Sequence, residues 1–204
     1  MASVSEPVVY VVDDNESARQ SLTWLIESVG LKVREFSSAQ QFLDACDTSL
    51  VGCLVLDMRM PGMSGLELQE RLCELGYTMP VIFITAFGEL QAAVLAMKRG
   101  AIDFIEKPYD SEQLLAQIQK ALREHAQRAG IEARIALLTR REKQVLDLVS
   151  NGRSSCSIAE HLCISQKTIE AHRTSIMKKM QVRSVSELIS VYLHTIRHGS
   201  VLNN

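Results

Sequence analysis

Three features that would assign this 204-residue chain to other classes of protein are missing from it. Its five cysteines are odd in number and show no CxxC spacing, which favours buried, reduced thiols in a reducing compartment over a disulfide framework. No apolar run approaches the ~18 residues of a membrane span. The amino terminus, MASVSEP, lacks the charged region and apolar core of a signal peptide. We therefore expect a cytoplasmic protein with no membrane partner.

The charged residues divide the chain into two halves of opposite sign. Residues 1–120 carry 17 acidic and 9 basic side chains, for a net charge of −8. Residues 121–204 carry 7 acidic and 13 basic side chains, for a net charge of +6, and also all five histidines. The length accommodates two small domains, and the basic half makes nucleic acid a candidate partner. The alternative is chance segregation of charge between two solvated surfaces.

In the acidic half, short apolar segments alternate with segments of helical periodicity. Five of each predict a doubly wound α/β fold, in which helices cover both faces of a parallel sheet. Right-handed crossovers make a flavodoxin-like strand order the most economical topology. The expected strands are Val8–Val12, Lys32–Phe36, Val51–Leu56, Pro80–Ile84 and Ile102–Ile105, and the expected helices are Ser17–Val29, Ser38–Cys46, Leu66–Leu75, Leu90–Arg99 and Ser111–Leu122.

The central expected strand ends in one acidic residue, Asp57, which a turn containing proline and glycine follows. Ligands of parallel α/β sheets bind beyond the carboxyl ends of the strands, so Asp57 would lie at a binding edge. The alternative is that Asp57 only caps the turn. Other strands bring polar residues to the same edge: Asp13 and Asp14 at the first, Thr85 at the fourth and Lys107 after the fifth.

Three carboxylates at one edge repel one another, and each costs free energy to desolvate. A divalent cation would relieve this repulsion, and hard oxygen ligands without cysteine or histidine select Mg²⁺. With the Lys107 ammonium and the Thr85 hydroxyl, the metal would orient a phosphoryl group for attack by Asp57. Taken singly, Asp14 would cap the next helix and Lys107 would be a solvated charge.

Four segments of the acidic half carry a family resemblance. The segments are VVDD at Val11–Asp14, LVLDMRMPGMSG at Leu54–Gly65, ITA at Ile84–Ala86 and EKP at Glu106–Pro108. Over residues 8–122 they resemble the receiver domain of bacterial two-component response regulators, which has a CheY-like, flavodoxin-like fold, and the expected domain spans residues 1–122.

This resemblance implies that Asp57 accepts a phosphoryl group from a sensor histidine kinase. Thr85 and Phe104 match the family's switch pair, in which the hydroxyl moves to the phosphoryl group and the aromatic ring turns inward. A Phe104 that serves only as core is the structural alternative. Phe87 departs from the histidine that close relatives often have. The implied Mg²⁺ ligands are Asp13, Asp14, Asp57 and the backbone carbonyl of Arg59.

The basic half begins with a segment, residues 123–136, that we expect to be a mostly exposed helical linker. Its apolar stripe fades after Leu122, and only Gly130 interrupts the helical pattern. The T-x-x-E sequence of Thr139–Glu142 is a capping box that opens a helix ended by Asn151 and Gly152. Three further helices are expected: Ser157–Leu162, one capped by Ser165, and Val185–Leu193.

Two short helices joined by a tight turn, the second with a polar and basic outer face, predict a helix-turn-helix that enters the major groove. The inner face should bury Ile169, His172, Ile176 and Met180. Lysines and arginines of the outer face suit phosphate contacts, whereas Glu170 is either a solvated charge or an acceptor from cytosine N4. The predicted DNA-binding residues are Lys167, Thr168, Glu170, Ala171, Arg173, Thr174, Lys178 and Lys179.

Three motifs of the same half carry a second resemblance: LTRREKQVLDLVSNG at Leu138–Gly152, IAEHLCIS at Ile158–Ser165 and TIEAHRTSIMKKM at Thr168–Met180. They resemble the DNA-binding domain of the NarL/FixJ family, which has a LuxR-type helix-turn-helix, and look closest to the FixJ-like branch. The chain departs at Ser155–Ser157, where relatives often carry an Asn-Lys-Glu type of sequence. The resemblance places the DNA-binding domain at 137–204.

Together these features predict a response regulator in which phosphorylation of Asp57 controls sequence-specific binding to double-stranded promoter DNA. The expected partners are the kinase, the DNA, RNA polymerase and, after phosphorylation, a second copy of the chain. Self-phosphorylation and autodephosphorylation at Asp57 would be the only chemistry. Two rivals keep part of the evidence: a DNA-binding regulator with a vestigial receiver, and a magnesium-dependent phosphohydrolase.

Overall fold

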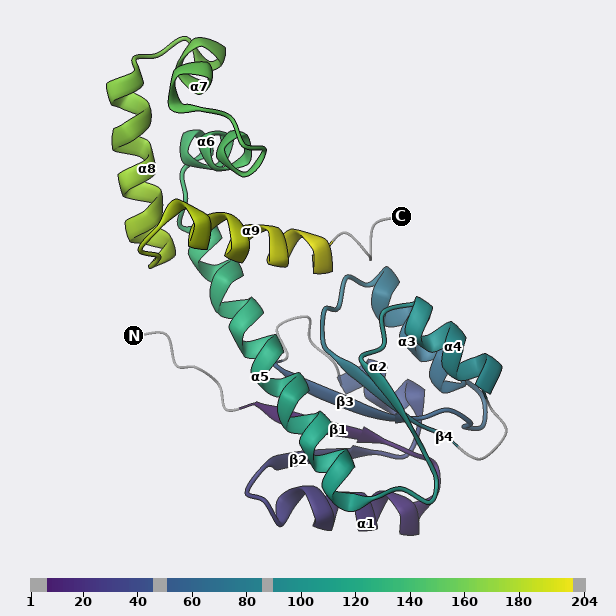
Figure 1. Ribbon diagram of the computed structural model, residues 1–204. Helices are drawn as coiled ribbons and strands as arrows, with labels where there is room; N and C mark the ends of the chain where they lie inside the picture. Colours follow the sequence, from purple (N-terminus) through teal and green to yellow (C-terminus); the bar gives the residue numbers. More distant parts are fainter. Residues whose placement is uncertain (1–6, 46–50, 86–89, 200–204) are drawn as a thin grey trace. The chain divides into compact units, whose positions relative to one another are not determined.

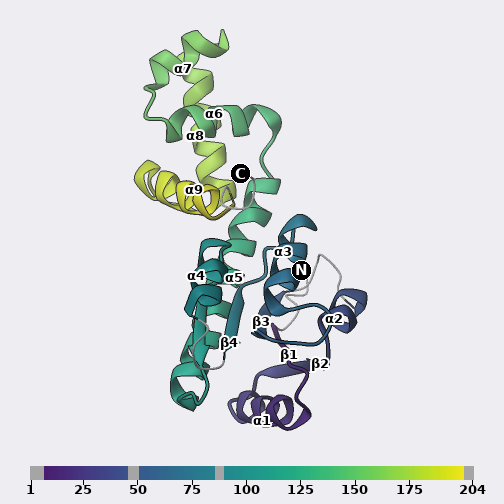
Figure 2. The same ribbon diagram turned by 90° about the vertical axis from the view of Figure 1, so that its right-hand side faces the viewer.

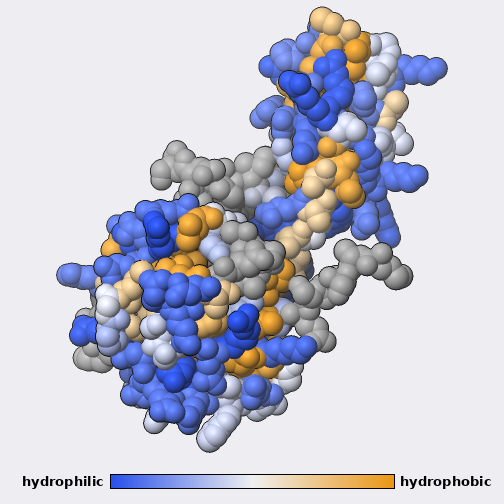
Figure 3. Space-filling view, turned by 180° about the vertical axis from the view of Figure 1, so that it is seen from behind, coloured by the Kyte–Doolittle hydropathy of each residue, from blue (hydrophilic) through white to orange (hydrophobic). Residues whose placement is uncertain are grey.

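A computed structural model describes residues 7–45, 51–85 and 90–199 of the chain. Two compact units divide near residue 126. The first combines strands and helices, and the second contains only helices in its described part (Figure 1). Polar and charged residues cover most of the face shown in Figure 3, with separate hydrophobic patches on both units.

The first unit is built on a five-stranded, fully parallel sheet in the order β2-β1-β3-β4-β5. This is the strand order of the predicted flavodoxin-like fold. Figures 1 and 2 show its helices on the two sides of the sheet. The strands are β1 (Val8–Val12), β2 (Lys32–Phe36), β3 (Gly52–Asp57), β4 (Val81–Thr85) and β5 (Asp103–Glu106).

Alternate residues of the central strands point into two hydrophobic cores, one on each face of the sheet. Leu54, Leu56 and Phe83 pack against α2 (Ala39–Ala45), α3 (Gly65–Glu74) and α4 (Leu90–Lys98). Cys53, Val55 and Ile82 pack against α1 (Glu16–Glu27) and the first part of α5 (Ser111–Ala136). Burial of β3 on both faces explains why its sequence is a continuous apolar run.

Three strands end one residue later than the sequence pattern predicts, with a consequence for the site. Asp57 pairs with Ile84, and Thr85 pairs with Glu106. Asp57 and Thr85 are therefore the last residues of their strands. The hydrogen-bonded ladder, unlike the apolar run, extends into the polar residues and holds their backbones in place.

The first helix begins at a different residue from the one suggested. Asn15 is its N-cap, and the Asn15 side chain accepts a hydrogen bond from Ala18 N. The alternative role of Asp14 as the cap is therefore wrong. At the start of α3, Ser64 and Glu67 form a reciprocal capping box, which fixes where the loop after Asp57 rejoins regular structure.

The second unit surrounds one hydrophobic core, formed mainly by Val145, Leu146, Ile158, Ile169 and Ile176. Its first helix opens with the predicted capping box of Thr139 and Glu142. The second helix starts two residues before the predicted position, because Ser154 caps it. The helices are α6 (Arg140–Ser150), α7 (Ser155–Leu162), α8 (Gln166–Met180) and α9 (Val185–Gly199).

The segment expected as a linker is the second half of one continuous helix. α5 runs from Ser111 through Gly130 to Ala136. Leu114 and Ile118 pack in the core beside the sheet, whereas Ile131 and Ile135 pack against the core of the second unit. The apolar stripe fades in the middle of this helix and resumes near its end.

The cysteines only partly follow the prediction of buried thiols. All four cysteines that the structure describes are free, and Cys53 is fully buried. Cys73 is half-buried, while Cys156 and Cys163 are exposed on α7 and at its C-terminal end. The prediction is wrong for the last two, because they lie outside the buried face that Ile158 and Ala159 form.

Candidate functional site

The carboxyl edge of the sheet brings together Asp13, Asp57 and Lys107, three of the predicted site residues. Lys107 Nζ lies 2.6 Å from Asp57 Oδ1 and 3.1 Å from Asp13 Oδ2. One ammonium group thus bridges the ends of β1 and β3. Asp13 is buried, and the Asp57 side chain is 12% exposed. The Asp57 carboxylate is therefore accessible from only a narrow part of the surface.

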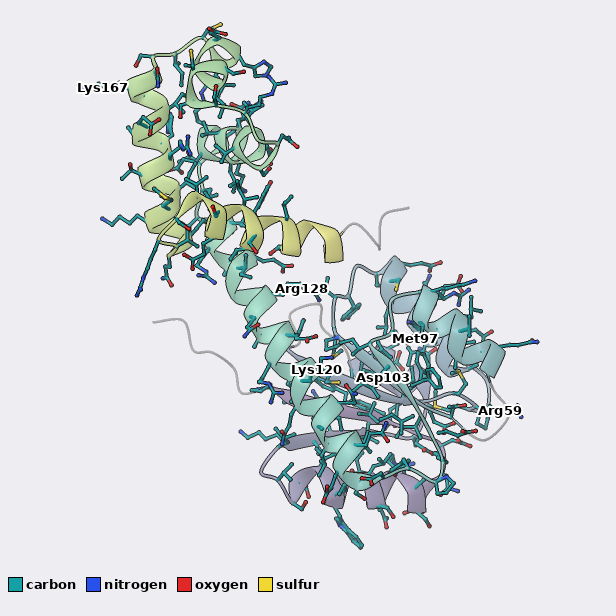
Figure 4. All side chains as sticks on the ribbon, in the orientation of Figure 1. Arg59, Met97, Asp103, Lys120, Arg128 and Lys167 are labelled. Atoms are coloured by element: carbon teal, nitrogen blue, oxygen red, sulfur yellow. The ribbon has the colours of Figure 1, made fainter. Side chains whose placement is uncertain are left out.

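The turn after β3 depends on Asp57 as well. Arg59 N donates a hydrogen bond of 2.8 Å to Asp57 Oδ2, so Asp57 caps this turn and binds Lys107 with its other oxygen. A Cβ atom at Gly65 would lie 2.3 Å from the Asp57 carbonyl oxygen. Only glycine lets α3 begin this close to the strand. Arg59 itself, which Figure 4 labels, is exposed.

Burial and neighbouring charges shift the pKa values of Asp57 and Lys107 in opposing directions. Burial raises the pKa of Asp57 and the charge of Asp13 adds to this effect, although the hydrogen bond and charge of Lys107 lower it. Burial alone would lower the pKa of Lys107, but Asp57 and Asp13 outweigh burial and raise it. Lys107 is therefore kept protonated, whereas the charged form of the neighbouring Asp57 carboxylate is disfavoured by burial.

Asp14 does not join this cluster. It is exposed, and within the described ranges no three acidic, histidine or cysteine side chains are arranged to hold a metal ion. The described residues therefore do not form the expected cluster of three carboxylates in this structure, and the role of Asp14 as a metal ligand stays a prediction. The Asp13 carboxylate is instead held by two contacts: Oδ1 accepts a hydrogen bond from Asn15 N, and Oδ2 accepts one from Lys107 Nζ.

The two residues of the predicted switch pair lie in different environments. Thr85 is 3% exposed, and its carbonyl accepts a 2.8 Å hydrogen bond from Lys107 N. Phe104 is 36% exposed on β5, so the alternative that Phe104 serves only as core is wrong. Phe87 lies outside the residues that the structure describes.

Arg19 supports the carboxyl edge of the sheet, a role that the sequence reasoning missed. Arg19 Nη1 donates a 2.8 Å hydrogen bond to the carbonyl of Asp13, and Nε lies 3.4 Å from Glu35 Oε2. These contacts tie α1 to the ends of β1 and β2. An arginine in an amphipathic helix carries no signal for such a role, because the contact depends on the register between strands that are distant in sequence.

The candidate nucleic-acid interface is the outer face of α8. Its buried residues are Ile169, Ile176 and Met180; His172 is only half-buried at the border of this narrow stripe. Six of the eight predicted DNA-binding residues are exposed: Lys167, Thr168, Glu170, Ala171, Thr174 and Lys178. Lys167 lies near the start of the helix (Figure 4).

Two predicted DNA contacts are engaged within the unit instead. Arg173 Nη1 donates to Ser155 Oγ over 2.6 Å, and Lys179 Nζ donates to Glu142 Oε2 over 2.7 Å. Both are only partly exposed. Arg173 follows Ile169 by four residues and precedes Ile176 by three, which places it toward the buried side of the helix.

Other polar side chains hold the helices of the second unit together. Arg141 Nη2 donates to the carbonyl of Leu162 at the end of α7, and Arg134 Nη1 donates to the carbonyl of Met180 at the end of α8. Arginines near helix C-termini satisfy carbonyls that have no intrahelical partner. The orientation of α8 is therefore fixed by polar contacts as well as by the core.

Comparisons with known proteins cover both units. The family described as response regulator receiver domain matches residues 9–119, and the family described as bacterial regulatory proteins, luxR family, matches residues 136–192. Transcriptional regulatory protein TdiR of Thauera aromatica is 44% identical over 199 residues, which cover 94% of this chain and 86% of that protein.

FixJ, which the sequence motifs resemble, is similar over almost the same length. Transcriptional regulatory protein FixJ of Azorhizobium caulinodans is 43% identical over 192 residues, which cover 91% of each protein. The crystal structure of full-length FixJ from B. japonicum has a TM-score of 0.57 at 39% identity and covers 94% of this chain and 98% of that one. In the part of the chain that the structure describes, no helix combines the length and apolar character that crossing a bilayer requires.

Proposed function

Because the chain belongs to the two-component response regulators that join a receiver domain to a LuxR-type DNA-binding domain, we propose that phosphorylation of Asp57 controls its binding to promoter DNA. Members of this family are transcriptional regulators rather than enzymes. The 2.6 Å contact between Asp57 and Lys107 carries the proposal. It puts a carboxylate and a positive charge together at the edge where ligands of such sheets bind.

The proposed chemistry is transfer from a phosphohistidine of a sensor kinase. A carboxylate oxygen of Asp57 bonds to phosphorus, the phosphorus–nitrogen bond breaks, and the imidazole nitrogen takes up a proton. Lys107 and the hydroxyl of Thr85 would bind oxygens of the transferred group. Phe104 would turn inward as Thr85 moves, which changes the surface beside α4.

Receiver domains generally bind Mg²⁺ at the phosphorylation site. The oxygen-rich edge here fits a hard cation, since carboxylate oxygens of Asp13 and Asp57 both lie within 3.1 Å of Lys107 Nζ and no sulfur ligand is near them in the contacts described. Asp14 and the Arg59 carbonyl are the further proposed ligands. The ion would neutralise charge on the phosphoryl oxygens, while Lys107 neutralises the carboxylates.

A second copy of the chain is the proposed partner after phosphorylation. Val94, Leu95 and Met97 on α4 are each at least 40% exposed, and Phe104 is exposed on β5; Met97 is labelled in Figure 4. Large apolar side chains gathered on one helix are typical of an interface. Dimers would double the contacts to DNA, and the bound protein would act on RNA polymerase in the cytoplasm, where the promoter is.

The decisive experiment combines labelling with DNA binding. The full chain is incubated with acetyl phosphate and Mg²⁺, and its affinity for DNA is measured before and after. Labelling of Asp57 together with tighter binding supports the proposal. DNA binding that is equal with and without a label at Asp57 would favour the vestigial-receiver alternative.

A further inference from the structure

Two adjacent lysines near the end of α8, Lys178 and Lys179, differ in what they contact. Lys178 is exposed. Lys179 Nζ forms an ion pair with Glu142 Oε2 at 2.7 Å, and the Glu142 side chain is 5% exposed. By sequence, both are equivalent candidates for a DNA phosphate contact, but only Lys178 has a side chain directed to solvent without a carboxylate partner in the contacts described.

Glu142 joins two helices through one carboxylate. Thr139 N donates to Glu142 Oε2 over 2.7 Å at the start of α6, and Ser175 Oγ donates to Glu142 Oε1 over 2.6 Å from α8. A buried carboxylate needs a charged partner, because removing that partner leaves an uncompensated charge. Moving Lys179 to a DNA phosphate would therefore break an internal contact to gain an external one.

Arg173 repeats this arrangement toward the other helix. Its guanidinium binds Ser155 Oγ at 2.6 Å, and Ser155 is buried at the start of α7. The middle of α8 is thus held to α7, and its last turns to α6. Four of the exposed residues of α8 follow one another at helical spacing along one stripe: Lys167, Ala171, Thr174 and Lys178.

We propose that the Glu142–Lys179 pair is a positioning device for α8, which sets how Ala171 and Thr174 meet base edges, and that Lys179 does not bind DNA phosphate. This inference rests on the proposed role of α8 in DNA recognition. Base contacts require a fixed helix orientation, whereas phosphate contacts carry no sequence information. Loss of the pair should thus reduce discrimination between DNA sequences more than it reduces general affinity.

The test compares Lys179→Gln with its matched control, Lys178→Gln, since each removes one positive charge from neighbouring positions. The full chain, treated with acetyl phosphate, binds two duplexes: one selected from a random library by the wild-type chain, and a shuffled duplex of the same composition. Affinity is measured between about 50 and 200 mM salt.

Lys178→Gln should weaken binding to both duplexes alike and reduce the salt slope by about one. Lys179→Gln should leave the salt slope unchanged and reduce the ratio of selected to shuffled affinity by about tenfold. Lys179→Arg should restore the ratio, because a guanidinium still donates to Glu142. A salt slope reduced by about one with an unchanged ratio would overturn the inference, and so would an unchanged slope with an unchanged ratio.

Glu142→Gln is an independent variant, in which the change of charge has the opposite sign to that in Lys179→Gln. It removes a negative charge, so charge alone predicts tighter binding to both duplexes. The positioning role instead predicts a lower ratio of selected to shuffled affinity. Thermal unfolding verifies that each variant is folded. If the wild-type chain fails to enrich any duplex from the library, the proposed function fails, a result distinct from every outcome with the variants.

Discussion

Each unit of the molecule contains a lysine paired with a poorly exposed carboxylate, and the pKa values of the two carboxylates shift in opposite directions. Asp57 receives hydrogen bonds from Lys107 and Arg59 N, yet burial still raises its pKa. At Glu142 burial also acts to raise the pKa, but donation by Lys179, Ser175 and Thr139 N outweighs it and lowers the pKa to about 2.

The comparison separates the proposed phosphoacceptor from a structural carboxylate. A carboxylate with fewer donors than it can accept has capacity left for a metal ion or a phosphoryl group. A carboxylate with a donor for every favourable direction is stable and unreactive. A lysine–carboxylate pair can therefore serve either purpose, and the two carboxylates here differ in how many donors bind them.

Removing the reactive carboxylate should have the largest effect. Asp57→Asn should abolish labelling by acetyl phosphate, because the amide cannot form the acyl phosphate. A matched Asp103→Asn variant, which alters a half-buried acid of the edge strand β5, should be labelled as the wild type is. Persistent labelling of Asp57→Asn at one equivalent would contradict the assignment.

The same variant should also be more stable at neutral pH. The folded-state pKa of Asp57 lies above its usual value of 3.8, so the stability linked to its protonated form is present below 3.8 and is lost as pH rises through the folded-state pKa. Asparagine carries no charge at any of these pH values. Thermal unfolding followed by the fluorescence of Trp24, the single tryptophan, should show a higher midpoint for Asp57→Asn at pH 7.

Charging the exposed apolar face of α4 should weaken self-association of the phosphorylated chain by about a hundredfold. Val94→Asp puts a carboxylate where the proposed dimer buries a methyl-rich side chain, at a cost of about 3 kcal/mol. Sedimentation after treatment with acetyl phosphate measures the change. The control is Leu75→Asp, which charges a side chain of similar exposure at the end of α3; an equal loss in both variants would exclude α4 as the interface.

The donor-rich carboxylate should make the second unit sensitive to acid. Because the folded-state pKa of Glu142 is lowered from 4.5 to about 2, its contribution is present above pH 4.5 and is lost as pH falls toward 2. After allowance for screening by solvent, the loss should be on the order of 2 kcal/mol. Amide exchange within α6 and α8 at decreasing pH measures it, and Glu142→Gln should flatten this dependence.

The smallest expected effect concerns backbone strain at the turn before α8. Cys163 adopts a left-handed conformation with φ of 53°, which glycine adopts more easily. Cys163→Gly should stabilise the chain by about 0.5 kcal/mol, the relief of strain less the entropy of glycine. Chemical denaturation measures the change. Cys156→Gly, inside α7, should destabilise the chain instead.

The sequence was sufficient for the features that depend on local pattern. Apolar runs ended by polar residues located the strands and the edge at which Asp57 and Lys107 meet, and helical periodicity located α6, with its capping box, and α8, with its N-cap Ser165. These signals are direct consequences of burial and of hydrogen bonding within one element.

Features that depend on contacts between distant elements were less accessible. Residue type does not indicate that Asp13 is buried while Asp14 is exposed, because Asp13 is bound by Lys107, which lies 94 positions away. Lys179 cannot be distinguished from Lys178 by residue type, since the difference is a carboxylate 37 positions away. Arg173 was predicted as a DNA contact although its spacing from Ile169 and Ile176 indicates the buried side of the helix, where it binds Ser155.

Because α5 continues without a break from one unit into the other, it decides where the chain can be cut into separately expressed fragments. A fragment that starts at Leu137 discards Ile131 and Ile135, which fill part of the second core, and Arg134, which caps Met180. A fragment that starts at Gln127 keeps all three. The helix has no loop at which to cut, so the safest breakpoint lies in its least apolar turns, and shuffling of such modules between proteins would be expected to join there as well.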